Sequence, residues 1–269
     1  MTRTFKSAII AAAAATAVFG AAQAQTNPAQ TPAPSKAASA VRNIVLVHGA
    51  FADGSGWRGV YDELTRRGYR VSIVQNPLTS LADDVAATRR VLARQEGPSI
   101  LVGHSYGGTV ITEAGSGADV AGLVYVAALA PDAGESTGDQ FAKIPAPSGF
   151  VIEPQKDGFG FVNGPKFKSG FAADVSDADA AFMRDSQVPI NMAAFGDKVS
   201  KAAWRAKPSW FVVATRDGAI EPALLRQTAK RIGATTREVE GSHVVFMSKP
   251  KAVADVIDEA ARHAAHAAR

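Results

Sequence analysis

The sequence predicts an α/β domain: a mostly parallel sheet flanked by helices, with a helical cap inserted before the last two strands. Two observations predict this fold class. From residue 41 onward, short β-branched runs alternate with amphipathic stretches, the pattern of repeated strand–helix–strand units. Between Pro131 and Pro208 the alternation stops, and helical fragments at 177–183 and 198–204 appear without a convincing strand. Because so long a structureless loop is unusual in a compact domain, we expect a cap over about residues 132–207.

Hydrophobic patterning predicts the elements of the sheet domain in order. Residues 43–47 (NIVLV) form an unbroken apolar run, as expected for a strand buried on both faces. Apolar side chains recur every three or four residues from 57 to 67, which predicts a helix that Gly68 ends. The same reasoning predicts further strands at 70–74, 99–102, 120–128, 210–214 and 236–239, and further helices at 80–95, 222–231 and 250–264, the first of these capped by Ser80.

The first 40 residues carry signals of export rather than of folding. A positively charged start precedes an alanine-rich uncharged stretch, and Ala22 and Ala24 are the small residues that a signal peptidase reads. We expect residues 1–24 to be a signal peptide cleaved after Ala24, and the protein to be periplasmic or secreted. Residues 25–40, rich in Pro, Thr, Gln, Ser and Ala, predict a disordered linker before a domain at 41–269. A retained anchor is the alternative, but the apolar stretch is short.

Composition excludes several classes of protein. The 269 residues are 46% hydrophobic and 20% charged, which fits a globular domain and not a disordered chain. The formal charge of +4 does not suggest nucleic acid binding, and no apolar run reaches the roughly 20 residues of a membrane-spanning helix. Without cysteine there is no disulfide, thiolate metal site or cysteine nucleophile, so nucleophilic chemistry falls to Ser, Thr, Lys or carboxylates.

The pentapeptide Gly103-His104-Ser105-Tyr106-Gly107 carries the strongest chemical signal. It stands between a predicted strand and an apolar helix, which is the context of a nucleophile elbow. Glycines on either side of the serine remove Cβ atoms that would clash in so tight a turn, and the hydroxyl is then exposed at the carboxyl end of the sheet. Ser105 is therefore the candidate nucleophile, and a plain glycine-rich turn is the alternative.

A serine nucleophile needs a base within hydrogen-bond reach, and that base is usually histidine. The chain has five histidines. His263 and His266 fall in the alanine-rich last helix and are most simply surface residues. His48 and His104 belong to tight loops, where we expect them to orient backbone. His243, in the turn after the last predicted strand, remains as the candidate base.

The third partner must be a carboxylate that fixes the histidine tautomer and stabilises its protonated form. Asp217 follows the strand at 210–214 and precedes His243, which gives the chain order Ser, Asp, His. Asp132, at the end of an earlier strand, is the competing acid, and Glu221 is a weaker one.

Backbone donors for a tetrahedral oxyanion have two candidate positions. The N–H of Tyr106 directly follows the nucleophile. The N–H of Ala50 lies in the loop after the first strand, where Gly49 permits an unusual backbone angle. Because both loops follow parallel strands, they would open at the same edge of the sheet. A plain strand-end turn is the alternative for the Ala50 loop.

The predicted cap is rich in phenylalanine. Eight of the thirteen phenylalanines lie in it, and their simplest role is to form the core of the cap. A few would instead line an apolar pocket where the cap meets the sheet, with Phe51 and Trp204 as further candidates for substrate contact. The eight are Phe141, Phe150, Phe159, Phe161, Phe167, Phe171, Phe182 and Phe195.

These motifs together resemble the α/β-hydrolase superfamily. The likeness is carried by VLVHGAFADGSGW, LVGHSYGG, PSWFVVATRDGAIEP and EGSHVVF, and in order and spacing it covers essentially all of residues 41–265. Within the superfamily, the chain is similar to small esterases related to plant methylesterases and hydroxynitrile lyases, and to bacterial carboxylesterases of the pyrethroid-hydrolase type.

The resemblance implies a triad of Ser105, Asp217 and His243, and an oxyanion hole made by Ala50 and Tyr106. It also implies a helical cap over the site and no cofactor, and we expect no metal. The resemblance names no substrate, but the phenylalanine-rich cap suggests a hydrophobic acyl or alcohol group, so we expect hydrolysis of small to medium hydrophobic esters through an acyl-enzyme on Ser105. The expected partner is therefore a small-molecule ester.

Three other activities stay open on this scaffold. Lyases of the group usually carry a lysine directly after the catalytic histidine and a threonine near the oxyanion loop. This sequence has Val244 and Gly49-Ala50 at those places, which favours hydrolysis over cyanohydrin cleavage. A cofactor-free perhydrolase or haloperoxidase would use the same residues, and a small-molecule receptor would use the same fold.

Overall fold

The computed structural model describes residues 41–267, with side chains through Ala264. The predicted signal peptide (1–24) and linker (25–40) lie outside the described residues, as does the side chain of His266. Among residues 41–267, no helix combines the length and the apolar character that crossing a membrane requires.

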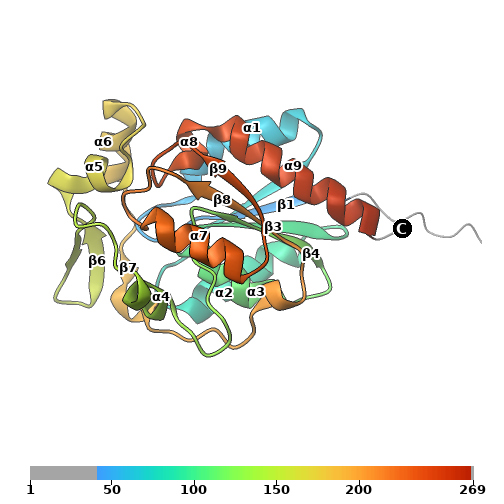
Figure 1. Cartoon of the computed structure of the whole chain (residues 1–269), viewed down its shortest axis with the longest axis horizontal. Helices are drawn as coiled ribbons and strands as arrows, with labels where there is room; N and C mark the ends of the chain where they lie inside the picture. Colours follow the sequence, from blue (N-terminus) through green and yellow to red (C-terminus); the bar gives the residue numbers. More distant parts are fainter. Residues whose placement is uncertain (1–40, 268–269) are drawn as a thin grey trace, which may run out of the picture. The chain divides into compact units, whose positions relative to one another are not determined.

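The central sheet consists of six parallel strands within residues 41–267, in the spatial order β2-β1-β3-β4-β8-β9 (Figure 1). The inner strands β1, β3 and β8 are buried along their whole length, because their runs of apolar residues face helices on both sides. Of the edge strands, β2 is mostly half-buried and β9 is mostly exposed. The strands are β1 (Asn43–Val47), β2 (Arg70–Val74), β3 (Ser99–His104), β4 (Val120–Val126), β8 (Ser209–Ala214) and β9 (Thr235–Val239).

Helices cover both faces of this sheet (Figure 1). On one face α1, α8 and α9 pack together, and α9 lies against β4 and β8. On the other face α3 packs against α2 and β3, and α7 packs against β8. These layers confirm the predicted fold class. The helices are α1 (Arg58–Arg66), α2 (Leu81–Leu92), α3 (Gly107–Ala114), α7 (Pro222–Arg231), α8 (Val245–Ser248) and α9 (Pro250–Ala267), and a 3-10 turn, η1 (Gly54–Trp57), leads into α1.

Local sequence signals set the helix ends. The hydroxyl of Ser80 accepts a hydrogen bond from the N–H of Asp83 at 3.1 Å, so α2 begins directly after Ser80. Gly68, with a φ of +86°, turns the chain out of α1 toward β2. Pro222 occupies the first position of α7, where its missing N–H costs nothing. Because each signal is local, the predicted ends fall close to the observed ones.

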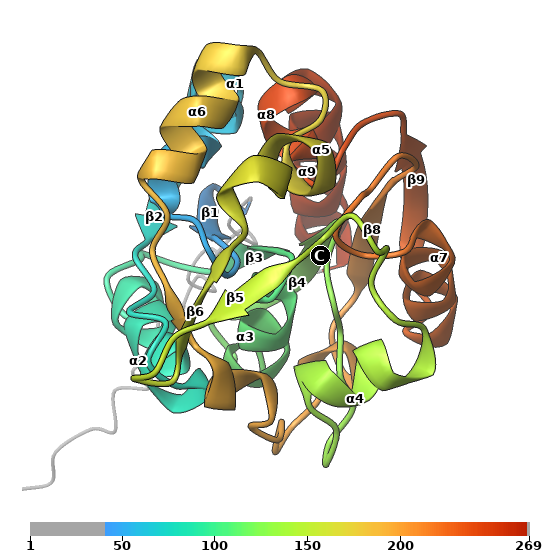
Figure 2. The same ribbon diagram turned by 90° about the vertical axis from the view of Figure 1, so that its left-hand side faces the viewer.

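The predicted cap lies between β4 and β8, at the carboxyl ends of the strands (Figure 2). It contains α4, whose first turn is held by a capping box between Ser136 and Asp139, and the short helices α5 and α6. The cap elements are α4 (Thr137–Lys143), β5 (Ile152–Pro154), β6 (Phe159–Val162), η2 (Gly164–Lys166), α5 (Phe167–Phe171), α6 (Asp177–Asp185), β7 (Ile190–Asn191), η3 (Met192–Phe195) and η4 (Ala203–Arg205).

Two expectations for the cap were wrong. The interval contains strands: β5, β6 and β7 form an antiparallel sheet (Figure 2). Each of these strands has four residues or fewer, which is too short for alternation to stand out in the sequence. The expected helix at 198–204 is absent from the structure of that segment, where an isolated bridge joins Lys198 to Ser136 and only the 3-10 turn η4 follows.

Candidate active site

Ser105 lies in the sharp turn between β3 and α3. Its φ of +55° is in the left-handed region, which a side chain adopts only when the surroundings hold it there. A Cβ on Gly103 would lie 2.5 Å from the carbonyl oxygen of Gly107, and a Cβ on Gly107 would lie 2.7 Å from that of His48. Only glycine therefore permits the chain to turn so tightly at these two places. The predicted elbow forms as expected, and the Ser105 side chain faces a cavity beneath the cap.

His243 meets Ser105 from the loop after β9. Its Nε2 atom accepts the Ser105 hydroxyl at 2.9 Å, and its side chain is buried. The carbonyl oxygen of His243 accepts the Nε2–H of His104 at 2.9 Å. Burial lowers the pKa of His104 well below its usual value, so its ring is neutral. As expected, His104 orients backbone, and the backbone that it orients belongs to His243.

Asp217 completes the hydrogen-bonded chain. It follows β8, and its Oδ2 atom accepts the Nδ1–H of His243 at 2.8 Å. Its Oδ1 atom accepts the backbone N–H groups of Ala219 and Ile220, each at 2.8 Å, which fixes the orientation of the carboxylate. With Nδ1 donating to Asp217, Nε2 is the lone-pair nitrogen, as a base for Ser105 requires. The structure thus brings Ser105, His243 and Asp217 together.

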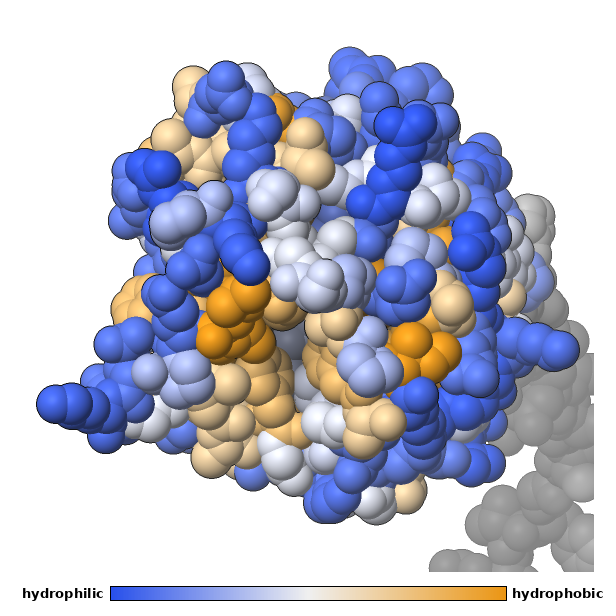
Figure 3. Space-filling model, turned by 60° about the vertical axis from the view of Figure 1, so that its left-hand side comes forward, coloured by the Kyte–Doolittle hydropathy of each residue, from blue (hydrophilic) through white to orange (hydrophobic). Residues whose placement is uncertain are grey.

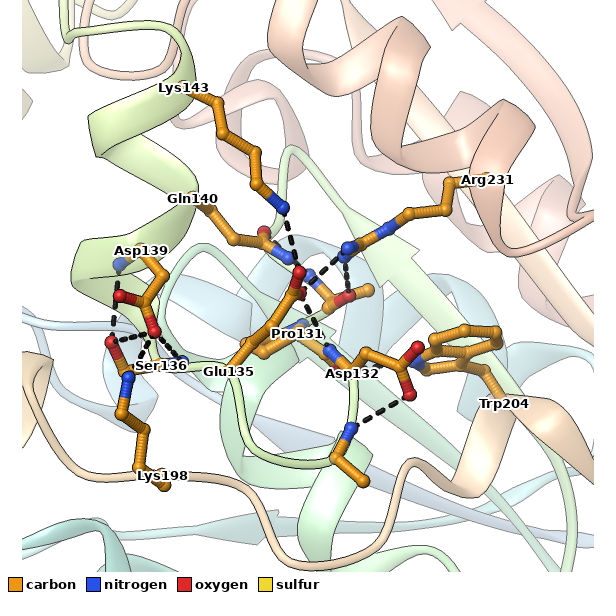
Figure 4. Close-up of polar contacts among 12 residues, drawn as sticks. Pro131, Asp132, Glu135, Ser136, Asp139, Gln140, Lys143, Lys198, Trp204 and Arg231 are labelled. Atoms are coloured by element: carbon orange, nitrogen blue, oxygen red, sulfur yellow. Dashed lines mark hydrogen bonds and ion pairs between the residues drawn. The ribbon is translucent and has the colours of Figure 1, made fainter.

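The competing acid Asp132 lies elsewhere. It forms an ion pair with Arg205, and the hydrogen bond from that guanidinium lowers the pKa of the carboxyl. Figure 4 shows Asp132 beside Glu135, which accepts hydrogen bonds from Lys143 and Arg231, each at 2.7 Å. Asp132 therefore belongs to a polar network at the base of the cap.

Glu221, the weaker alternative, lies at the N-terminus of α7. Its backbone carbonyl accepts the N–H of Leu224 at 2.8 Å, within the first turn of that helix. It is Asp217, and neither alternative, that contacts the ring of His243.

The loops that carry Ala50 and Tyr106 follow β1 and β3, which are paired neighbours. The two loops touch, because a Cβ on Gly49 would lie 2.7 Å from the Cβ of Ser105. His48 braces the first loop: its Nδ1–H donates to the carbonyl of Gly49, and its Nε2 accepts the N–H of Asn76, both at 2.9 Å. Ala50 and Tyr106 both line the cavity that Ser105 faces.

This site cavity has a volume of about 350 Å³ and a mostly apolar lining. Figure 3 shows a hollow bordered by hydrophobic residues on the side of the molecule where the cap lies. Ser105 and His243 line the site cavity, as does the predicted contact residue Phe51. Four of the eight cap phenylalanines line it as well: Phe141, Phe150, Phe171 and Phe195. Phe167 instead packs on Phe171, as a core residue of the cap.

Trp204, a predicted substrate contact, lies at the base of the cap and not at the site cavity. Its indole N–H donates to the carbonyl of Pro131 at 3.0 Å, beside the network of Figure 4. The guanidinium of Arg205 lies over its ring, 4.9 Å from the centroid. Trp204 therefore braces the base of the cap and does not line the site cavity.

Two residues that hold the loops of His243 and Tyr106 are not predicted from the sequence. Asp174 of the cap accepts the N–H of Ser242 at 2.9 Å, directly before His243. Asp84 of α2 is buried and accepts the Tyr106 hydroxyl at 3.0 Å, beneath the elbow. Both contacts join segments that are far apart in the chain, so no local sequence pattern predicts them.

The sequence pattern of the Alpha/beta hydrolase family matches residues 44–256. A pyrethroid hydrolase from Sphingobium wenxiniae is 39% identical to this chain over 104 residues, which are 33% of this chain and 36% of that protein. The chain thus matches about a third of the length of that relative.

Solved structures share the fold. A pyrethroid hydrolase from Sphingobium faniae JZ-2 matches with a TM-score of 0.67 and 22% identity, over 82% of this chain and 97% of that one. Polyneuridine aldehyde esterase matches with a TM-score of 0.70 and 17% identity, over 81% of this chain and 98% of that one. These likenesses concern the fold, whereas the family pattern spans the sheet together with the loops of Ser105, Asp217 and His243. The resemblance inferred from the motifs is confirmed: the chain belongs to the alpha/beta hydrolase family.

Proposed function

We propose that this protein is a serine carboxylesterase that cleaves small to medium hydrophobic esters. The observation that carries the proposal is the chain of hydrogen bonds from Ser105 Oγ to His243 Nε2 (2.9 Å) and from His243 Nδ1 to Asp217 Oδ2 (2.8 Å), at the wall of an apolar cavity. A serine with such a base, oriented by a carboxylate, is the arrangement that acyl transfer needs.

In the first half of the reaction, Ser105 Oγ attacks the ester carbonyl carbon while His243 Nε2 takes the hydroxyl proton. The carbonyl oxygen becomes an oxyanion, which the N–H groups of Ala50 and Tyr106 stabilise. Asp217 stabilises the imidazolium. As the intermediate collapses, the carbon–oxygen bond to the alcohol breaks, and His243 passes its proton to the leaving alkoxide. An acyl ester on Ser105 and a free alcohol result.

In the second half, water replaces the alcohol. His243 takes a proton from the water as its oxygen attacks the acyl carbon, and the same two N–H groups hold the second oxyanion. Collapse of this intermediate breaks the bond between the acyl carbon and Ser105 Oγ, and His243 returns the proton to the serine. The carboxylic acid leaves, and the protein regains its starting state.

The substrate class follows from the lining of the site cavity. The aromatic rings of Phe51, Phe141, Phe150 and Phe195 offer apolar contact, and a volume of about 350 Å³ suits a group of small to moderate size. The related proteins named above carry hydrolase and esterase activities in their names, which supports an ester as the substrate.

The test is hydrolysis of p-nitrophenyl esters, from acetate to long acyl chains, by the unsubstituted protein and by Ser105→Ala. We expect Ser105→Ala to lower kcat by about a million-fold, because the three residues act as a unit. Ser200→Ala, a surface serine that contacts Glu113, is the matched control and should keep full activity. Wild-type turnover by Ser105→Ala would defeat the proposal. Release of an aldehyde from a cyanohydrin, without ester hydrolysis, would assign the site to a lyase.

A further inference from the structure

A second hollow of about 370 Å³ lies against the wall of the site cavity. We call it the side groove. It is bounded by the loop after β1, by Val175 and α6 of the cap, and by Phe246 and Met247 of α8. Of the residues that line the two hollows, Phe51 is the one they share. Its neighbours in sequence divide in the same way: Ala50 lines the site cavity and Ala52 lines the side groove.

Phe51 is built as a partition between the two hollows. Its φ of +62° is in the left-handed region, so its backbone is held in an unfavourable conformation. Its ring packs edge-on against Phe150, at 6.2 Å between centroids, and at a tilt against Phe195, at 6.3 Å. Both contacts are to rings that line the site cavity. Phe51 therefore stands where the linings of the two hollows meet.

The lining of the side groove combines apolar and charged side chains. Met183 and Met247 offer flexible, polarisable side chains, which adapt to ligands of irregular shape. Phe182 also lines the groove, and with 61% of its surface exposed it is the one large hydrophobic side chain so exposed in residues 41–264. The charged residues Asp53, Arg58 and Asp179 also line the groove, so the apolar contacts come from its phenylalanine, valine and methionine side chains.

We propose that the side groove is a second substrate subsite, and that Phe51 is the gate between it and the site cavity. One hydrophobic arm of the ester fills the site cavity, and the other arm, an aryl or long alkyl group, passes Phe51 into the side groove. The ester group between the arms then lies at Ser105. This proposal rests on the proposed esterase function and extends it to esters with two bulky arms.

The test compares two esters that differ in one arm, benzyl butanoate and 4-phenylbenzyl butanoate. Met183→Trp fills the side groove from a residue that does not line the site cavity. We expect it to lower kcat/KM for the 4-phenylbenzyl ester about tenfold through KM, and to leave the benzyl ester unchanged. Arg184→Trp adds the same bulk to the next residue of α6, outside both linings, and should change neither value.

A double-mutant cycle tests the gate itself. Phe51→Ala removes the partition and should raise the ratio of kcat/KM between the long and the short ester about tenfold. In Phe51→Ala/Met183→Trp this gain should disappear, because the groove is filled. A gain that persists in the double variant would overturn the proposal, as would Met183→Trp affecting both esters equally or neither.

Equilibrium binding separates this proposal from the proposed function. Binding does not require catalysis, so the affinity of Ser105→Ala for the two esters reports on the subsite alone. We expect Met183→Trp, added to Ser105→Ala, to weaken binding of the 4-phenylbenzyl ester about tenfold and to leave the benzyl ester unchanged. That result would support the subsite even if the esterase activity were absent, and equal binding of both esters before and after the substitution would overturn it.

Discussion

At the scale of single residues, the candidate site depends on glycines, which have no side chain, as much as on the residues that carry the polar groups. Gly49 lets the loop after β1 lie against Ser105, since a Cβ there would come within 2.7 Å of the serine Cβ. Gly107 lets α3 begin against the carbonyl of His48. Through these contacts the loops that carry Ala50 and Tyr106 meet beside Ser105, and both residues line the site cavity.

Asp84 is the residue whose protonation we expect to change stability. Burial raises its pKa from 3.8 to about 6, although it accepts hydrogen bonds from Leu78 N–H and the Tyr106 hydroxyl. Between these two values the folded chain binds more protons than the unfolded chain. The contribution of Asp84 to the free energy of unfolding therefore falls as the pH rises from 3.8 to about 6, by about 2 kcal/mol.

Denaturant unfolding of the unsubstituted protein and of Asp84→Asn, between pH 4 and pH 7, checks this prediction. The difference in free energy should move in favour of the Asn variant as the pH rises, because Asn cannot ionise. Asp83→Asn is the contrasting control, because hydrogen bonds from Thr79 and Ser80 lower the pKa of Asp83. A difference for Asp84→Asn that is flat with pH would contradict the assignment.

At the scale of elements, one cap segment, Gly170 to Asp174, contacts both the loop of Asp217 and the loop of His243. A Cβ on Gly218, next to Asp217, would lie 2.8 Å from the carbonyl oxygen of Gly170 in α5. The ring of Phe171 lies 4.9 Å from the ring of His243, edge to face. Asp174 then accepts the N–H and the hydroxyl of Ser242. The cap therefore holds the loops of Asp217 and His243 in addition to lining the site cavity.

Asp174→Ala should separate this positioning role from substrate binding. Without the carboxylate, the Ser242 N–H and the Ser248 hydroxyl lose their acceptor, and the His243 loop loses its tie to the cap. We expect kcat to fall about tenfold with little change in KM, since Asp174 does not line the site cavity. The readout is kcat and KM for a p-nitrophenyl ester.

Asp177→Ala is the matched control, because this exposed cap carboxylate contacts Lys168 and no part of the His243 loop. It should keep both kinetic constants. An equal loss in the two variants, or a rise in KM alone for Asp174→Ala, would show that Asp174 does not position the base.

At the scale of the whole molecule, the sequence predicts what is local and misses what is distant. The sheet strands and the elbow at Ser105 are encoded by runs of a few residues, and Asp217 and His243 follow from their places after strands. The antiparallel cap sheet, the tie from Asp174 and the location of Trp204 depend on segments that meet only in the folded chain. The hydrophobic character of Trp204 predicts a substrate contact, but in the folded chain its indole N–H donates to the carbonyl of Pro131.

Export is the second prediction at this scale. We propose that residues 1–24 are removed and that the protein is periplasmic or secreted, because a charged start, an alanine-rich stretch and small residues before Gln25 form a signal pattern. Expression of the full chain in a Gram-negative bacterium, followed by fractionation and N-terminal sequencing, checks the proposal. We expect Gln25 as the first residue of the periplasmic protein, and an intact N-terminus in the cytoplasm would contradict it.

The assignment of Ser105 as the nucleophile is tested most directly by the mass of the protein after reaction with diethyl p-nitrophenyl phosphate, which phosphorylates activated serines. We expect one diethylphosphoryl group per chain, located on Ser105 by peptide mapping, with release of one equivalent of p-nitrophenol. We also expect His243→Ala to label at least a hundredfold more slowly, because the base is missing. An unlabelled protein, or a label on another residue that persists in Ser105→Ala, would contradict the assignment of Ser105 as the nucleophile.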